Sequence, residues 1–333
     1  VWIVFPILIS GFSFFFRRKK TLVWITLSLI SLVLTLIAWF LPIGELVNMG
    51  PWYFSINESL ELAGRQFSLE NSDRWLIILI YFTQTYLYFG TKFIKVSSLF
   101  LPLGLLFCAF MVASISAQPI MYAALLIEIA VLIGVPLLSP PGKKTEHAIL
   151  VYITFLSIGL PFMIIGGGMI SSVELYDLSF PDVLPSIMVL GIGFAFLLAV
   201  FPLNPWVPLL LEKGKPYSSV FVLTIFPISV IALLIRYTNL YPWIIESNLI
   251  QYFGILMVIT GGAWVIFQRN LGRIMGYAVL IDIGYSLLAI SQSDGFFIFI
   301  GLLIPRIIAY GIWALGLTFI LEQGINLNFR SVQ

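Results

Sequence analysis

Charged side chains are scarce in this chain of 333 residues, where Lys, Arg, Asp and Glu make up 10% and hydrophobic residues 60%. Soluble domains average about 25% charged residues, so this chain has too little polar surface to cover a globule in water. The composition therefore predicts a protein that uses lipid as its solvent. It argues against dissolved hydrolases, nucleic-acid-binding modules and disulfide-rich secreted proteins.

Residues that bind metals or carry redox chemistry are almost absent too. The one histidine, His147, excludes a multi-histidine metal site, and we interpret it as a solvated residue at a helix start. The one cysteine, Cys108, cannot form an internal disulfide, and its apolar surroundings predict an inert buried thiol. No phosphate-binding loop and no nucleophile paired with a base is present either. We therefore expect no metal, no cofactor and no catalytic site in this chain.

What the chain has in abundance is long apolar runs. A bilayer core needs about 20 apolar residues per helix, and the candidates are 1–16, 21–41, 74–91, 96–117, 119–139, 147–170, 184–203, 218–237, 249–268, 273–292 and 295–321. We predict an all-α polytopic membrane protein of about eleven transmembrane helices, forming a single membrane domain over residues 1–333. The first run begins at Val1 without a methionine or a charged n-region, so we expect a missing N-terminus and not a signal peptide.

The basic residues predict the orientation of these spans. With the N-terminus outside, 13 of the 17 basic residues fall in inner connections. They are Arg17, Arg18, Lys19, Lys20, Lys92, Lys95, Lys143, Lys144, Lys213, Lys215, Arg269, Arg273 and Arg330. Because Lys and Arg are retained on the cytoplasmic side, this asymmetry favours an outside N-terminus. The long outer connection, about residues 42–73, alternates weakly at 52–56 and at 66–69, which predicts a short surface hairpin.

Ionisable groups inside apolar spans are costly in lipid, so each is a functional candidate. Glu128 lies about ten residues into the fifth run. Desolvation disfavours its charged form unless it is paired, which suits a group that exchanges protons. A carboxylate that only holds neighbouring helices together is an equally good interpretation.

Asp282 and Arg306 lie in the middle of the tenth and eleventh runs. Opposite charges at similar depth on consecutive helices predict a buried salt bridge. We favour a structural role for this pair, because a permanently charged arginine keeps its partner a carboxylate, and a fixed carboxylate is a poor proton shuttle.

Prolines interrupt the seventh and eighth runs. Pro202, Pro205 and Pro208 fall within seven residues at the end of the seventh run, and Pro227 lies in the middle of the eighth. Proline removes a backbone donor and breaks the helical ladder. We therefore predict a broken seventh helix followed by a short segment near the inner surface, and a kink at Pro227. In membranes, broken helices are tolerated where they are buried in protein or line a hydrated cavity.

Two segments resemble a known family. The run 191–208, Gly-Ile-Gly-Phe-Ala-Phe-Leu-Leu-Ala-Val-Phe-Pro-Leu-Asn-Pro-Trp-Val-Pro, is similar to the broken seventh helix of the antiporter-like membrane subunits of complex I. These subunits are shared with multisubunit cation/proton antiporters and membrane-bound hydrogenases. The run from Gln268 to Tyr285 resembles the same family's loop and tenth helix, in order and at matching spacing.

The resemblance implies a mid-membrane proton path built from a glutamate in the fifth helix and lysines in the seventh and eighth. Glu128 matches the glutamate, but the two lysine positions fall at Leu197 and near Pro227. In the eleventh helix, where some members carry histidines and a lysine, this chain has Arg306, Tyr310 and Ala314. The chain also has about eleven spans where members usually have fourteen. We therefore expect the fold to be retained and the charge relay lost.

The same resemblance implies a large complex around this chain. We expect a structural or regulatory membrane-arm subunit of an NADH or ferredoxin:quinone oxidoreductase, with quinone, FMN and iron–sulfur clusters in partner subunits. Other membrane-arm subunits and the lipid bilayer are the expected partners, and nucleic acid is not. A bacterial inner membrane is the favoured location, with thylakoid or mitochondrial inner membranes as alternatives. A subunit of a cation/proton antiporter or membrane-bound hydrogenase, and a pure assembly scaffold, remain as alternative functions.

Overall fold

The computed structural model describes residues 1–49, 52–56, 59–62, 64–139, 146–173, 180–292 and 294–332. Lys143 and Lys144, which enter the prediction of orientation, lie outside these ranges. Backbone contacts divide the chain into two compact units, Val1–Leu137 and Leu138–Gln333. The prediction of one membrane domain therefore stays a prediction, and the two units are described in turn.

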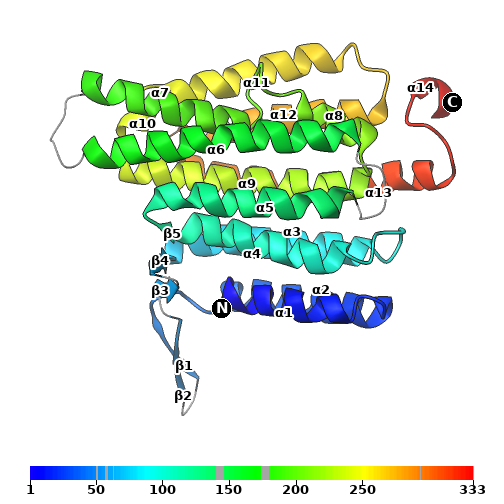
Figure 1. Ribbon diagram of the computed structural model, residues 1–333, viewed down its shortest axis with the longest axis horizontal. Helices are drawn as coiled ribbons and strands as arrows, with labels where there is room; N and C mark the ends of the chain where they lie inside the picture. The colour runs from blue at the N-terminus through cyan, green and yellow to red at the C-terminus, as the bar shows by residue number, and fades with distance from the viewer. Residues whose placement is uncertain are drawn as a thin grey trace. The chain divides into compact units, whose positions relative to one another are not determined.

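The described part of the first unit combines five main helices with two small antiparallel sheets (Figure 1). Its elements are α1 (Val4–Phe15), α2 (Lys20–Phe40), β1 (Leu46–Met49), β2 (Trp52–Ser55), β3 (Ser59–Leu62), β4 (Arg65–Ser68), η1 (Asn71–Asp73), α3 (Arg74–Gly90), α4 (Phe100–Ser116), β5 (Ala117–Gln118), η2 (Ile120–Tyr122) and α5 (Ala123–Leu138). Within this unit, the turn between α1 and α2 and the loop between α3 and α4 lie at one end, and the strands lie at the other.

Polar side chains hold the apolar helices of the first unit together. The indole N–H of Trp2 donates to the carbonyl of Leu34, 3.1 Å away, and the Tyr81 hydroxyl donates to the carbonyl of Trp2. The hydroxyls of Ser31 and Thr85 lie 2.7 Å apart between α2 and α3. In a lipid-like interior a buried polar group must find a partner within the protein, so these bonds fix which helices pack together.

The connection from α2 to α3, predicted to lie outside, forms two hairpins where one was predicted. Strand β1 pairs antiparallel with β2, and β3 pairs with β4, which also pairs with β5. The alternating stretches 52–56 and 66–69 therefore belong to different hairpins. Gly64, at φ 72°, supplies the left-handed backbone that the tight turn between β3 and β4 needs. These short strands make the protein mostly helical where the sequence predicted an all-α protein.

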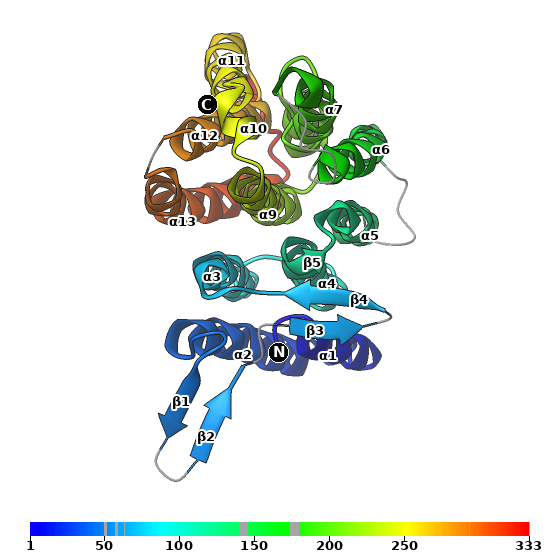
Figure 2. The same ribbon diagram turned by 90° about the vertical axis from the view of Figure 1, so that its left-hand side faces the viewer.

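One helix of the second unit is buried along most of its length. The elements of this unit are α6 (His147–Val173), α7 (Phe180–Leu197), α8 (Trp206–Lys213), α9 (Pro216–Leu240), α10 (Trp243–Glu246), α11 (Leu249–Val265), α12 (Leu271–Ile290), α13 (Gly295–Glu322) and α14 (Phe329–Val332). Figure 2 shows α9 among α7, α12 and α13, and it contacts all three as well as α8 and α10. In the most apolar stretch of α9, 94% of the residues are buried, so α9 lies in the core of this unit.

Each apolar run predicted from the sequence contains a helix. Among the residues that the structure describes, six helical segments are long and apolar enough to cross a membrane: Lys20–Phe40, Ile120–Leu138, His147–Ile170, Pro216–Leu240, Leu271–Ile290 and Gly295–Glu322. Four shorter apolar helices of 10–17 residues accompany them. Large apolar side chains point outward from these helices, among them Leu8 at 67% exposed and Ile259 at 64%. Such a surface is stable against lipid and not against water.

Candidate functional site

The two charged residues that lie in the middle of apolar runs of the second unit, Asp282 and Arg306, face each other between α12 and α13. Asp282 and Ser286 lie one turn apart on α12, and Arg306 and Tyr310 lie one turn apart on α13. Residues at this i, i+4 spacing share a helix face, so each helix presents two polar groups to the other. We call these four residues the polar cluster.

Asp282 and Arg306, the two charges predicted to pair, lie in contact. The Nε of Arg306 is 3.3 Å from the Oδ2 of Asp282, and the two side chains are 12% and 27% exposed. Arg306 Nη1 also donates to the hydroxyl of Ser286, 2.7 Å away, which in turn donates to the carbonyl of Asp282. The Tyr310 hydroxyl donates a hydrogen bond to Asp282 Oδ2. The carboxylate is therefore held by a cation and a phenol together.

A small cavity of about 20 Å³ adjoins the polar cluster. Residues of α9 complete its wall, including Leu223, Thr224 and Pro227. Because Pro227 has no N–H, the carbonyl of Leu223 one turn earlier has no helical donor. The cavity has room for about one water molecule, and Thr224 and the four residues of the polar cluster are among the residues that line it.

The break after α7 begins before the prolines that predicted it. The helix ends at Leu197, and the N–H of Val200 bonds back to the carbonyl of Ala195, 2.9 Å away, while Ala199 N–H bonds to that of Phe196. Ala199 has φ 56°, so this is a Schellman-type helix end with alanine at the position glycine usually takes. Pro202 and Pro205 lie in the eight-residue connection, and Pro205 directly precedes α8.

Glycines position α8 against the rest of the unit. A side-chain carbon on Gly276 would lie 2.5 Å from the Cα of Pro208, and one on Gly272 would lie 2.3 Å from the carbonyl of Leu211. These two glycines, four residues apart on α12, let the α8 backbone approach closely. Pro208 lies in the first turn of α8, where a missing N–H costs no helical bond. Helix α9 runs from Pro216 to Leu240 and continues through Pro227.

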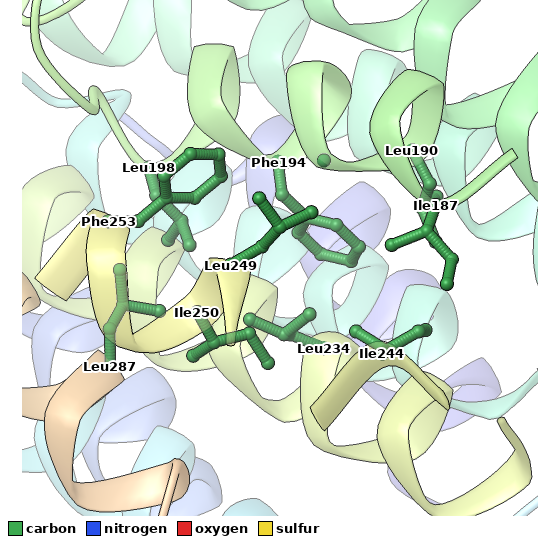
Figure 3. Close-up of a pocket in the computed structure, with 11 residues that line it drawn as sticks. Ile187, Leu190, Phe194, Leu198, Leu234, Ile244, Leu249, Ile250, Phe253 and Leu287 are labelled. Atoms are coloured by element: carbon green, nitrogen blue, oxygen red, sulfur yellow. The ribbon is translucent and has the colours of Figure 1, made fainter. Parts of the chain in front are cut away.

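The positions where the resemblance expects lysines are apolar. Leu197 is fully buried at the end of α7, and Pro227 lies buried in α9. Figure 3 shows a neighbouring cavity of about 30 Å³ between α7, α9, α10 and α11, with apolar side chains around it. Those side chains are Ile187, Leu190, Phe194, Leu198, Leu234, Ile244, Leu249, Ile250, Phe253 and Leu287. None of them can take up or release a proton.

Glu128 belongs to the first unit and is partly buried in the middle of α5. It lies at the border between buried Ile127 and Val131 and the outward-facing Leu125 and Ile129. Its function as a proton-exchanging or helix-pairing residue stays a prediction.

The remaining candidate residues carry no assembled site in the described ranges. His147 is exposed at the first position of α6, and Cys108 is fully buried in α4. Among the residues that the structure describes, no group of three or more His, Cys, Asp or Glu side chains could hold a metal ion. The sequence analysis did not identify Ser286 as part of the site, although it lies four residues after Asp282 on a predicted helix. Tyr310 lies four residues after Arg306, and this spacing could have indicated both as partners of the charged pair.

Curated relatives share parts of this sequence. No protein-family model matches the chain. It is 26% identical over 194 residues to NADH-quinone oxidoreductase subunit N of Ectopseudomonas mendocina, covering 50% of this chain and 39% of that protein. It is 32% identical over 120 residues to the subunit of the same name from Rickettsia typhi, covering 33% of this chain and 25% of that protein. The chain is a distant homologue of NADH-quinone oxidoreductase subunit N.

Solved structures match the fold over nearly the whole chain. A chain of the membrane-bound sulfane sulfur reductase, an archaeal respiratory membrane complex, superposes with a TM-score of 0.75 at 18% identity, covering 98% of this chain and 72% of that one. A chain of respiratory complex I from Thermus thermophilus gives 0.73 at 18% identity, with the same coverage of both chains. A chain of the Mrp complex from Dietzia gives 0.73 at 14% identity, covering 96% and 63%.

These matches establish the fold as that of antiporter-like membrane subunits, and this chain as an integral membrane protein. The homologues are subunits of large membrane complexes. The matched region amounts to 39% or less of the length of these two curated relatives.

Proposed function

We propose that this chain is a membrane-arm subunit of an NADH or ferredoxin:quinone oxidoreductase of the complex I type. The observation that carries the proposal is the agreement of two independent comparisons. The sequence is related to subunit N of the NADH-quinone oxidoreductase. The fold matches a chain of respiratory complex I over 98% of this chain and 72% of the complex I chain. Partners would be other membrane-arm subunits. Quinone, FMN and iron–sulfur clusters would belong to subunits other than this one.

The helices in the eleven predicted apolar runs would all cross the bilayer in this assembly, with the N-terminus outside. Six of them are long enough by themselves. The shorter ones, such as α4 with 17 residues, span about 25 Å at 1.5 Å per residue, which local thinning of the bilayer or packing against neighbouring helices accommodates. A bacterial inner membrane is the location we favour.

We infer a structural or regulatory role for the chain within this complex. A relay of protons needs groups that change their charge along a connected path, and leucine and proline occupy the two lysine positions. The polar cluster does not replace them, because the ion pair and the hydrogen bonds from Tyr310 and to Ser286 hold Asp282 and Arg306 in one geometry between two helices and form no connected path. Its role would be to hold α12 against α13.

A subunit of a multisubunit cation/proton antiporter is the second candidate. The match to a chain of the Mrp complex has the same TM-score, 0.73, as the match to complex I, so the fold supports this candidate as well. A membrane-bound hydrogenase subunit or a pure assembly scaffold would share the same fold. We prefer the quinone oxidoreductase because the sequence relationship to subunit N supports it.

Purification of the chain from its native membrane separates these functions. We expect the tagged full chain, extracted in mild detergent, to bring down iron–sulfur polypeptides and quinone-reducing activity. Co-purification with membrane polypeptides alone, together with sodium- or potassium-dependent proton exchange, would assign it to an antiporter. Recovery as a stable lone monomer would refute both assignments to a complex.

A further inference from the structure

A cavity of about 590 Å³ lies in the first unit. It opens where the turn from α1 to α2 meets the loop from α3 to α4. Four basic residues line it: Arg17 from the α1–α2 turn, Lys20 at the first position of α2, and Lys92 and Lys95 from the α3–α4 loop. We call it the basic pocket.

The charge of the basic pocket has one sign. Every lining residue that carries a charge at neutral pH is a lysine or an arginine. Hydroxyl groups of Thr21, Ser97 and Ser98 add further hydrogen-bonding groups to the wall. Several cations that converge on one concavity create a positive potential that concentrates anions, and Lys and Arg bind phosphate oxygens well. The pocket therefore suits a phosphate-bearing group.

The wall behind these cations is apolar and held in place. The indole N–H of Trp24 donates to the carbonyl of Tyr88, 3.0 Å away, and its ring packs edge-on against Phe89. The Lys92 ammonium lies 5.6 Å from the centre of the same indole ring. Buried Val23 and Leu101 continue the wall toward the helices. A tryptophan fixed between cations and apolar helices is typical of the interface between bilayer and water.

Apolar surface continues from the pocket along the helices. Ile25, on the first turns of α2, lines the pocket and is 52% exposed, and Phe93 beside Lys92 is 65% exposed. A ligand that is anionic at one end and hydrocarbon at the other would satisfy both surfaces. A volume of this size lies within the range of ordinary small-molecule sites, about 300–1,000 Å³.

We propose that the basic pocket binds the headgroup of an anionic phospholipid. The phosphate would lie among the four cations, and the acyl chains would run along the exposed apolar face of α2. Charge complementarity selects an anionic lipid over a zwitterionic one, and the adjoining apolar surface selects a lipid over free phosphate. The predicted orientation places this pocket at the inner leaflet, where polybasic segments meet anionic lipids.

A lipid titration tests the site with a matched control. The full chain in detergent, or the complex that contains it, is titrated with phosphatidylglycerol and with phosphatidylcholine, and bound lipid is counted by native mass spectrometry. The test variant is Lys20→Gln/Lys92→Gln. The control is Arg18→Gln/Lys19→Gln, which removes the same charge from exposed residues of the α1–α2 turn that do not line the pocket.

We expect wild type to prefer phosphatidylglycerol, and the test variant to lose roughly 30-fold in affinity, since each lysine near an anionic lipid surface contributes about fivefold. The control should keep the preference. Equal binding of both lipids, or an equal loss in both variants, would overturn the proposal. Displacement of phosphatidylglycerol by millimolar inorganic phosphate would show a soluble-anion site instead. If the double substitution impairs folding, Lys92→Gln alone, at an exposed position, should still lower the affinity for phosphatidylglycerol.

Discussion

The ion pair between Asp282 and Arg306 allows a quantitative test of how the second unit is held together. We expect Arg306→Ala and Asp282→Ala each to lower the free energy of unfolding by about 3 kcal/mol. Breaking a buried pair costs about 3–5 kcal/mol because one charge stays buried without its partner. The lower end applies because the Asp282 side chain is 27% exposed, whereas that of Arg306 is only 12% exposed.

The double variant is the decisive member of the cycle. With both charges removed, no ion is left unpaired, so the loss in the double variant should be well below the sum of the two single losses. We expect a coupling energy of about 3 kcal/mol. Tyr310→Phe, which removes only the phenol bond to the carboxylate, should cost about 2 kcal/mol. Unfolding by denaturant in mixed detergent micelles, followed by circular dichroism, measures wild type and the four variants.

A second ion pair in the same unit supplies the control. Arg273 pairs with Glu212 between α12 and α8, but the Arg273 side chain is 44% exposed. Pairs that water screens contribute about 0–1 kcal/mol, so the same cycle at this site should give a coupling below about 1 kcal/mol. Additive losses at Asp282 and Arg306, or a coupling no larger than in the control, would refute the structural role of the buried pair.

Two further predictions concern packing and capping. Gly166→Ala should destabilise the second unit by at least about 1–3 kcal/mol, because the added carbon would lie 2.5 Å from the backbone nitrogen of Leu190 on α7. Gly168→Ala, where the carbon would meet nothing within 4 Å, should be neutral or stabilising by about 0.5–1 kcal/mol, and the reverse order in thermal unfolding would contradict the packing of α6 on α7. Asn270→Ala should cost about 1 kcal/mol, since the Asn270 side chain accepts bonds from the N–H groups of Gly272 and Arg273 at the start of α12. Amide hydrogen exchange should show fraying confined to that first turn, and unchanged protection there would argue against the cap.

Hydropathy predicted the helices well because a helix that crosses a bilayer needs apolar side chains along its whole length. The run 147–170 corresponds to α6, His147–Val173, and 273–292 to α12, Leu271–Ile290. The end of α7 was harder to predict. The prolines mark the break, but the helix stops earlier through backbone bonds around Ala199, and alanine carries no sequence signal for a left-handed turn.

Strand pairing in the outer connection was beyond the reach of local pattern. Alternation identified strand-like stretches at 52–56 and 66–69, but which stretches pair depends on where the tight turns fall. Strand β5, only two residues at the end of α4, has no pattern of its own and is defined by its pairing with Gln66 and Phe67.

The charged residues of the candidate site were predictable and their neighbours were not. Asp282 and Arg306 stand out because ions are rare in apolar runs, and equal depth on consecutive helices suggested that they meet. Tyr310 and Ser286 are ordinary residues in membrane helices. The basic pocket was not predicted as a site either, because its cations come from two stretches of the chain that only the fold brings together.

The measurement that bears most directly on the proposed function is proton translocation by the complex carrying Glu128→Gln. The substitution keeps the shape of the side chain and removes its ability to exchange a proton. In liposomes containing the reconstituted complex, the number of protons moved per electron should equal that of wild type and of a Glu146→Gln control at an exposed position. A marked fall with Glu128→Gln alone would contradict the account and show that protons pass through this chain.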